Sequence, residues 1–422
     1  MQARIGKFEL KKLLGKGASG KVYLAFDTFN ELDVALKVLD PAVVSGEDVE
    51  KTHMHQFLNE ASLAGKLSHP HIASILEASV NSEPGYIALE YVPGGDLTQY
   101  TDPVKLLRVE DAIEIAFKCC GALDYAFKQG IVHRDIKPAN IMVVSGTDIK
   151  VADFGAAFLH RAQATQITDI GSPLYMSPEQ IKGDNLGHQS DMFALGVVLY
   201  ELFTGQRPFV ATTLSELFKV IMFEQPEAPS ARRPELNKDI DRILLKMLSK
   251  SPADRYASWA DLALELADIG RLSVYHQQVA DSEKFIAMRR IPVLQILSDA
   301  EIWEMVHTGR WSRIPPRKAI IREGQPGSTL CFLASGEVKI TKQGKLLNIL
   351  GSGEYFGEMG YVKNGEMPRH ATVESTTDVL LAEFEPDALE KVSIGCRLQL
   401  TVALLHAMVD RLALADSRLV RA

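Results

Sequence analysis

The segment His133-Arg134-Asp135-Ile136-Lys137-Pro138-Ala139-Asn140 is followed shortly by Asp153-Phe154-Gly155 in this chain of 422 residues. Transfer of a γ-phosphoryl group needs little covalent chemistry from a protein. It needs residues that stabilise charge, residues that hold metal ions and one acceptor for a hydroxyl proton. We expect Asp135 to accept that proton, and Asn140 and Asp153 to hold magnesium ions. These residue types occur in the order that phosphoryl transfer from ATP requires.

The same segment resembles the catalytic loop of the eukaryotic-like protein kinases, and Lys137, two places after the aspartate, is typical of their Ser/Thr branch. Membership would make Asp135 and Lys137 catalytic residues, and Asn140 and Asp153 the residues that hold the metal. The resemblance implies a bilobal kinase fold of the α+β class over residues 1–270. It also implies ATP and Mg²⁺ as cofactors, proteins as substrates, and the activity of a non-specific serine/threonine protein kinase.

A glycine-rich segment, Gly15-Lys16-Gly17-Ala18-Ser19-Gly20-Lys21-Val22, lies between two apolar runs and has the spacing G-x-G-x-x-G-x-V. Glycines allow the backbone to turn tightly and to approach phosphates closely. Val34-Ala35-Leu36-Lys37 follows on an expected strand, and in the resembling family this lysine binds the α- and β-phosphates. Taken alone, these segments would be an ordinary glycine turn and a solvated strand end. The resemblance assigns the contacts with ATP to Gly15, Gly17, Gly20, Val22, Ala35, Lys37, Glu90 and Val92.

A helix is expected around residues 56–64, where apolar residues recur with the 3.6-residue period of an amphipathic helix. This helix would carry Glu60, our candidate for the carboxylate that pairs with Lys37. Without that lysine, Glu60 would be interpreted as part of a solvated face. Farther along the chain, Leu89-Glu90-Tyr91-Val92 resembles the hinge that presents backbone groups to adenine, and Asp96 follows as a candidate N-cap of the next helix.

Several conspicuous residues are expected to be structural. His133 has a side chain whose ordinary pKa is near neutrality, yet the histidine at this place in the resembling family packs in the core. The resemblance also pairs Glu179 with Arg255. It makes Asp191 the anchor of the helix that holds the catalytic loop, and Phe154 a hydrophobic plug.

The polar segment of residues 156–176 contains hydroxyls that the kinase itself could phosphorylate. We expect the phosphosite to be Thr165 or Thr168, because Arg134 beside the catalytic aspartate would give a phosphate a basic partner. Ser172 resembles instead the residue that contacts the catalytic aspartate and lysine. For either threonine taken singly, the alternative is a hydroxyl of a solvated loop.

The chain is longer than one such catalytic domain, and its length favours two or three domains. Kinase-like sequence ends near residue 270, and the polar residues 271–290 are expected to form a linker that is helical or extended. From residue 291 onward, short β-like runs alternate with glycine-containing turns, which predicts a small antiparallel roll or barrel. We therefore expect a second domain over residues 291–386 and C-terminal helices over residues 387–422.

The second domain resembles the cyclic-nucleotide-binding domain over its whole region, from Leu294 to Phe384. The resemblance is carried by the segments Ile320-Ile321-Arg322-Glu323-Gly324, Leu330-Cys331-Phe332-Leu333-Ala334-Ser335-Gly336-Glu337-Val338, Tyr355-Phe356-Gly357-Glu358-Met359-Gly360 and Pro368-Arg369-His370-Ala371-Thr372-Val373. A cyclic nucleotide carries one negative phosphate and a free ribose 2′-hydroxyl, so its pocket needs a forked cation and an acceptor. Arg369 would bind the phosphate, helped by N–H groups near Gly357, and Glu358 would accept from the 2′-hydroxyl. The expected pocket residues are Gly357, Glu358, Arg369, His370 and Ala371.

Two alternatives stay open for this domain: an Arg369–Glu358 ion pair in place of a ligand, or an empty domain that serves packing or dimerisation. The spacing from glutamate to arginine is a little longer than in the commonest members of the family, which places residues 363–366 in an extended loop. His370 stands where a threonine often accompanies cGMP preference. Because threonine is missing there, cAMP is favoured over cGMP.

Leucine recurs once per heptad near the C-terminus, with valine at the companion positions: Leu398, Leu405, Leu412 and Leu419, and Val402 and Val409. A stripe of this kind fits a parallel two-helix seam and predicts a homodimer. The alternative is an amphipathic helix that folds back on its own domain. Asp416, which interrupts the valine stripe, keeps that alternative open, and dimerisation is the preferred interpretation.

The net charge of −8 and the pI near 5.8 exclude an overall basic surface, and no helix-turn-helix sequence remains outside the two domains. We therefore expect no nucleic-acid partner. Residues 1–7 lack an apolar signal core, and the most apolar helix, around residues 194–203, is short and contains Glu201. These features predict no membrane partner and a cytoplasmic location. The four cysteines show no metal-binding spacing and are expected to be reduced core thiols.

Together these patterns predict a Ser/Thr protein kinase that is regulated by a cyclic nucleotide bound to its C-terminal domain. In one competing interpretation, the C-terminal domain is only an empty dimerisation or interaction module. In another, the kinase half is a catalytically inactive scaffold. The intact set of Lys37, Glu60, Asp135, Asn140 and Asp153 argues against the second of these.

Overall fold

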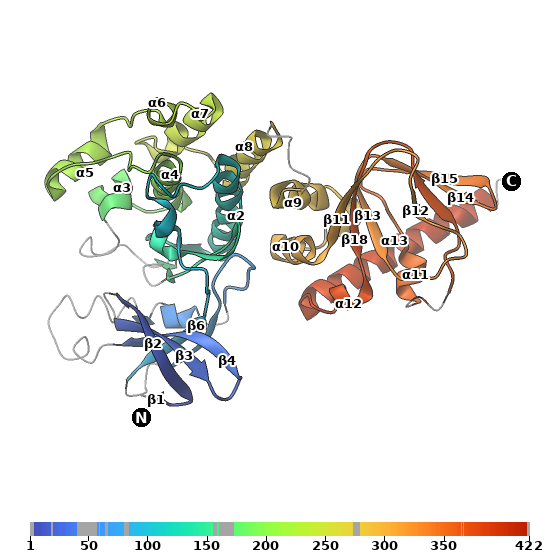
Figure 1. The fold of residues 1–422 in the computed structure, drawn as a ribbon, viewed down its shortest axis with the longest axis horizontal. Coiled ribbons are helices and arrows are strands. Elements are labelled where there is room, and N and C mark those ends of the chain that lie inside the picture. The colour runs from blue at the N-terminus through green and yellow to red at the C-terminus, as the bar shows by residue number, and fades with distance from the viewer. Residues whose placement is uncertain are drawn as a thin grey trace. The chain divides into compact units, whose positions relative to one another are not determined.

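The computed structural model consists of two compact units, Met1–Ser273 and Val274–Ala422, which are described separately (Figure 1). The structure describes residues 4–17, 20–39, 57–58, 60–63, 66–79, 84–154, 158–159, 173–272, 279–363, 365 and 367–419.

The first unit begins with an antiparallel sheet of six strands in the order β1-β2-β3-β4-β6-β5. These strands are β1 (Arg4–Ile5), β2 (Phe8–Gly17), β3 (Gly20–Asp27), β4 (Leu32–Leu39), β5 (Ile75–Ser79) and β6 (Tyr86–Glu90). Side chains alternate between the two faces of a strand. Val34, Leu36 and Val38 of β4 therefore pack into a core on one face. Leu39 joins a second small core with Phe57 on the other face, where Lys37 also lies.

The rest of the first unit is mainly helical. Its elements are η2 (Leu97–Tyr100), α2 (Val109–Lys128), β7 (Ile131–Val132), η3 (Pro138–Asn140), β8 (Ile141–Ser145), β9 (Asp148–Val151), β10 (Phe158–Leu159), η5 (Pro173–Tyr175), α3 (Pro178–Lys182), α4 (His188–Thr204), α5 (Leu214–Phe223), α6 (Pro229–Arg232), α7 (Lys238–Met247), η6 (Pro252–Asp254) and α8 (Trp259–Leu272). Every residue of α4 from 190 to 204 is buried, as expected for a helix that is apolar on all sides. Helices α4 and α8 both pack against α2, and together they form the core of this part (Figure 1).

One hairpin and one pair of strands that are distant in sequence lie between α2 and α3. Strand β8 pairs with β9, and β7 pairs with β10. A bridge between Ile72 and Val151, together with the N–H of Val151 donating to His71, ties β9 to the segment that leads into β5. Asp153, the second residue after this hairpin, is thereby held close to the sheet that carries Lys37.

The second unit contains two four-stranded antiparallel sheets, with strand orders β11-β18-β13-β16 and β12-β17-β14-β15. Their strands are β11 (Arg310–Ile314), β12 (Ala319–Ile321), β13 (Leu330–Ser335), β14 (Glu337–Lys342), β15 (Lys345–Gly351), β16 (Tyr355–Phe356), β17 (Thr372–Ser375) and β18 (Val379–Phe384). Apolar side chains from both sheets, among them Leu333, Leu350 and Val373, form one core. Gln343 and Gly344, with φ of 49° and 76°, join β14 to β15 in a two-residue turn, the geometry that hairpin twist favours. The predicted antiparallel roll is confirmed.

Helices flank these sheets: α9 (Asp281–Arg289), η7 (Pro292–Leu294), α10 (Asp299–Thr308), α11 (Glu358–Val362), α12 (Pro386–Leu389) and α13 (Ile394–Leu419). Helix α9 packs on α10 (Figure 1), so the part of the expected linker that it covers is helical and belongs to the second unit. Helix α13 buries Cys396, Leu400 and Leu404 against its own unit, whereas Leu398 and Leu405 on the same helix are exposed.

Candidate functional site

The glycine-rich turn connects β2 to β3. Gly17 pairs with Gly20 across the hairpin, whereas Ala18 and Ser19 lie outside the described residues. The register of β3 with β4 places Val22 opposite Lys37. Since side chains two residues apart share a face, Val22, Ala35 and Lys37 all lie on one face of the sheet.

The expected hinge follows β6. Val92 is buried, and the Glu90 carboxylate accepts from the N–H of Ser74 at 3.2 Å and pairs with Lys150 at 3.0 Å. Four residues after Val92, the predicted N-cap is confirmed: the Asp96 side chain accepts from the N–H of Thr98 at the start of η2. The hinge segment is thus held on both sides by local contacts.

Lys37 lies between two carboxylates. Its Nζ is 2.6 Å from Oε2 of Glu60 and 3.0 Å from Oδ1 of Asp153. Burial alone would lower the pKa of Lys37, but the charges of Glu60 and Asp153 outweigh burial and raise it. Burial raises the pKa of Glu60, against the opposing effect of Lys37. The expected Lys37–Glu60 contact is therefore present, and Asp153 completes a group of three charges.

Asp135 is held by its neighbours in the catalytic loop. Lys137 donates to its Oδ2 at 2.7 Å, and Nδ2 of Asn140 donates to the same oxygen at 3.1 Å and to the Asp135 carbonyl at 2.8 Å. The Asn140 carbonyl in turn accepts from the N–H of Ala152, which precedes Asp153. The loop and the Asp153 segment are therefore joined directly.

Asp191 of α4, expected to anchor the helix that holds the catalytic loop, contacts the backbone of the loop itself. Its two carboxylate oxygens accept from the N–H groups of His133 and Arg134 at 2.8 and 2.7 Å. Arg134 has φ of 68°, an unusual conformation for a residue other than glycine. His133 is fully buried and packs against the ring of Phe154 with 4.5 Å between centroids, so its expected packing role is confirmed.

The pair of Glu179 and Arg255 is also present. Two guanidinium nitrogens of Arg255 lie 2.6 and 2.9 Å from the two carboxylate oxygens of Glu179, and both side chains are buried. Such a bidentate pair fixes geometry as well as charge. It ties α3 to the segment before α8. Ser172 and the expected phosphosites Thr165 and Thr168 lie outside the described residues.

A pocket of about 200 Å³ opens at one end of the second unit, where residues from both sheets meet. Its wall includes Arg310, Arg322, Gly327, Thr329, Arg369 and Glu383. Of the residues expected at a ligand pocket, only Arg369 is in this wall. Gly357, with φ of 88°, and Glu358 form the start of α11. His370 is exposed and Ala371 is half-buried just before β17.

The guanidinium of Arg369 is held by backbone carbonyls. Nη1 donates to the carbonyls of Thr329 at 3.2 Å and Gly357 at 3.3 Å, and Nη2 donates to Thr329 at 3.2 Å. Within the described residues, no ion pair joins Arg369 to Glu358. Arg369 is therefore held by backbone carbonyls and not by the ion pair with Glu358 that was one alternative for this domain.

Sequence reasoning missed three charged residues of this pocket: Arg310, Arg322 and Glu383. Arg310 pairs with Glu383 at 2.9 Å. Glu383 stands opposite Cys331 in the sheet, and Cys331 belongs to the core between the sheets. Glu383 is the one glutamate in the otherwise apolar run of β18, and it lies on the same face as the core residues Val379 and Leu381. This position was the signal that could have revealed Glu383 as a pocket residue.

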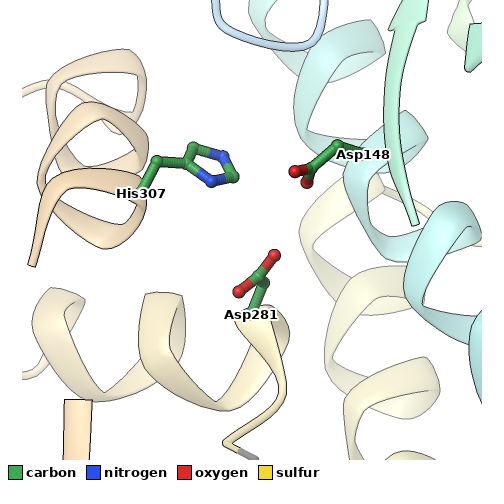
Figure 2. Close-up of side chains that lie close together, drawn as sticks. All are labelled: Asp148, Asp281 and His307. Carbon is green, nitrogen blue, oxygen red and sulfur yellow. The ribbon is translucent and has the colours of Figure 1, made fainter. Parts of the chain in front are cut away.

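Figure 2 shows Asp148, Asp281 and His307, and each has a partner within its own unit. Asp148 at the start of β9 pairs with the buried Lys118 at 2.5 Å. Asp281 at the start of α9 pairs with Lys284 at 2.7 Å. The ring of His307 stacks on an indole of its own helix, α10, with 5.6 Å between centroids. We assign these three residues structural roles.

The fold and the site define a protein kinase unit followed by a cyclic nucleotide-binding domain. The protein kinase domain family matches residues 8–265, and the cyclic nucleotide-binding domain family matches residues 311–393. The chain belongs to the protein kinase family. Among the described helices, none combines the length and the apolar character that crossing a lipid bilayer requires.

The first unit is similar to curated serine/threonine-protein kinases of bacteria. Identity with PknB of Mycobacterium leprae is 36% over 268 residues, which cover 62% of this chain and 42% of that protein. Identity with PknB of Mycobacterium tuberculosis strain H37Rv is 35% over 271 residues, covering 62% and 43%. Identity with pkn3 of Myxococcus xanthus is 36% over 284 residues, covering 63% and 50%. The chain spans no more than half the length of these relatives.

Proposed function

We propose that this chain transfers the γ-phosphoryl group of ATP to serine and threonine hydroxyls of proteins. The observation that carries the proposal is the convergence of Lys37, Glu60 and Asp153 beside the loop of Asp135 and Asn140. Phosphoryl transfer depends on positioning and on charge stabilisation, and this group of residues supplies both.

Each residue has a role that its contacts support. Asp135, held by Lys137 and Asn140, accepts the proton of the attacking hydroxyl. Lys37, held by Glu60, orients the α- and β-phosphates of ATP. The glycines 15, 17 and 20, with Val22, Ala35, Glu90 and Val92, form the rest of the ATP site.

Asn140 and Asp153 offer oxygens that suit Mg²⁺. The amide nitrogen of Asn140 is committed to Asp135, which leaves its amide oxygen for a metal. One carboxylate oxygen of Asp153 contacts Lys37, which leaves the other. Oxygen ligands of this kind, together with substrate phosphates, are the usual surroundings of Mg²⁺. The bound ion would neutralise negative charge on the phosphates.

The test is a phosphotransfer assay of the full chain with Mg-ATP and a general acceptor protein such as casein. We expect phosphate on serine and threonine, with none on tyrosine. Mass spectrometry of the same sample should find phosphate between residues 153 and 177, at Thr165 or Thr168, if Arg134 serves as its partner. No transfer to either the acceptor or the chain would contradict the proposed activity.

We further propose that the second unit binds a cyclic nucleotide, cAMP in preference to cGMP, and that binding changes kinase activity. Arg369 lies in the wall of the pocket, and α11 begins beside it with Gly357. The pocket of about 200 Å³ is smaller than the common range of about 300–1,000 Å³ for ligand sites. Arg310 and Arg322 in its wall are exposed, so their side chains can move when a nucleotide enters.

Calorimetry with each nucleotide tests binding, and phosphotransfer with and without nucleotide tests regulation. A ligand changes activity only if it binds two states of the protein with different affinity. Binding without any effect on phosphotransfer would contradict regulation alone. Lack of binding by both nucleotides would instead favour a dimerisation module, which the exposed Leu398 and Leu405 of α13 also support.

A further inference from the structure

The side chain of Arg369 is oriented by the loop between β12 and β13. Thr329 accepts from both terminal nitrogens of the guanidinium, and Gly357 accepts from one of them. A guanidinium has five N–H donors in a rigid fork. Since Nη1 makes two of these contacts and Nη2 makes one, the edge formed by Nε and Nη2 keeps donors for an anion.

That edge of the guanidinium faces Gly327. A Cβ at residue 327 would lie 2.8 Å from Nε and 3.0 Å from Nη2 of Arg369. A larger residue at this position would require the guanidinium to shift, so Gly327 is compatible with the present position of this edge. Gly327 and Arg369 both line the pocket. The loop therefore orients the arginine on one side and leaves space on the other.

Glu385 fixes this loop from outside the pocket. Oγ1 of Thr329 donates to Oε1 of Glu385 at 2.7 Å, and Oγ of Ser328 lies 3.5 Å from Oε2. A hydrogen bond to a carboxylate is roughly twice as strong as one between neutral groups. Thr329 therefore makes two kinds of contact. Its hydroxyl donates to the Glu385 carboxylate, and its backbone carbonyl accepts from Arg369.

Glu385 is also the residue that precedes α12, at its N-cap position. Helix α12 is followed within a few residues by Ser393, whose N–H and hydroxyl both donate to Glu304 of α10. Helix α13 starts at the next residue. Hydrogen bonds therefore connect Arg369 to Thr329 and Thr329 to Glu385, which directly precedes the C-terminal helices.

We propose that Glu385 and Thr329 are positioning residues for Arg369 and set the affinity of the second unit for its anionic ligand. The hydrogen bond between them holds the Thr329 carbonyl where it orients the guanidinium fork before the ligand arrives. Preorganisation of this kind raises affinity because less ordering remains to occur on binding. The inference rests on the proposed binding of a cyclic nucleotide.

The test is calorimetry of the full chain with cAMP and with cGMP. Thr329→Val and Glu385→Ala each remove the hydrogen bond and should weaken binding roughly three- to tenfold. Thr329→Ser keeps the hydroxyl and Glu385→Gln keeps an acceptor oxygen, so both should bind as the wild type does. The double variant Thr329→Val/Glu385→Ala should bind no more weakly than the weaker single variant, because the two changes remove one shared interaction.

Thr376→Val is the matched control. Thr376 donates to Oε1 of Glu337 at 2.8 Å, an exposed threonine–glutamate bond in the same unit that is not part of the pocket. It should leave ligand affinity unchanged. If the wild type binds a nucleotide and Thr329→Val and Glu385→Ala bind as tightly as Thr376→Val, the positioning role is overturned and the proposed binding stands. If the wild type binds neither nucleotide, both are overturned.

Discussion

Lys37 depends on its two carboxylate partners, because a buried charge without a partner is costly. Its contacts with Glu60 and Asp153, at 2.6 and 3.0 Å, keep it protonated in a buried position. Glu60 is almost fully buried, and burial raises its pKa. The three groups hold one another at the place where the phosphates of ATP would bind.

The first prediction concerns Lys37→Met and Asp153→Ala. Each should reduce phosphotransfer by about 100-fold or more, because each removes a charge that stabilises the transferred group. Initial rates with Mg-ATP measure the effect, and circular dichroism verifies the fold. Lys11→Met, which removes an exposed lysine of β2 that pairs with Asp33, is the control and should keep the wild-type rate. Full activity of either site variant would contradict the kinase assignment.

The second prediction concerns Arg369→Glu. It replaces the forked cation of the pocket with a carboxylate, so affinity for the cyclic nucleotide should fall by at least about 30-fold. Calorimetry measures this loss, and the affinity for ATP in the same variant should not change. Lys345→Glu, with the same change of charge at an exposed site outside the pocket wall, should bind normally. Equal losses in the two variants would mean that overall charge, and not Arg369, determines binding.

Among the structural elements, the turn between β3 and β4 shows how one carboxylate can order a connection. Asp27 accepts from the N–H groups of Phe29 and Asn30 and from the side-chain amide of Asn30, a pattern typical of aspartate in turns. Lys7 lies 2.9 Å from the same carboxylate. Burial opposes ionisation, but Lys7 and Asn30 outweigh it and lower the pKa of Asp27 to about 2.

The third prediction follows from the sign of that shift. The pKa of Asp27 is about 2 in the folded state and near 3.9 in an unfolded chain. Its stabilising effect is therefore complete above about pH 5 and is lost as the pH falls towards 2. Asp27→Asn should lower the melting temperature of the first unit by roughly 2–4 °C at pH 7, and the difference from the wild type should shrink between pH 4 and pH 2. Scanning calorimetry at several pH values measures it; a difference that does not depend on pH would contradict this account.

At the scale of the whole molecule, α13 combines a buried face with an exposed apolar one. Leu398 and Leu405, one heptad apart, are each 59% exposed, and Val409 is 58% exposed. An apolar stripe with this spacing on a long helix fits the seam between two parallel helices. The buried face, with Leu400 and Leu404, accounts for the alternative of a helix folded on its own unit. The helix can therefore pack on its own unit through the buried face and pair with a second copy through the exposed face.

The fourth prediction concerns the oligomeric state. The wild type should form a dimer in sedimentation velocity. The double variant Leu398→Glu/Leu405→Glu should be monomeric, because carboxylates buried in the seam would repel one another and would lose their hydration. Leu346→Glu/Leu347→Glu changes two leucines that are equally exposed, at 59% each, on β15, and it should remain dimeric. A wild type that is monomeric at every concentration tested would contradict the seam.

Many contacts of the kinase unit could be predicted because its functional residues lie in short, recognisable sequence motifs. The contacts of Lys37 with Glu60 and of Glu179 with Arg255 were each expected and are each present. An anchoring role was expected for Asp191, and it contacts the catalytic loop. The antiparallel architecture of the second unit could also be predicted from its alternating runs and glycine turns. Burial patterns and turn residues act locally, so they can be recognised without coordinates.

The wall of the pocket in the second unit was decided by the tertiary structure. Arg310 and Glu383 meet across 73 residues of sequence, and Thr329 reaches Glu385 across 56. Pairing of β18 with β11 and with β13 in one sheet brings these side chains together, and no local sequence pattern encodes that pairing. By itself, the sequence determined which residues can carry charge, turn tightly or pack in the core. The fold decided which of them share a pocket, because long-range strand pairing fixes the positions of groups that are far apart along the chain.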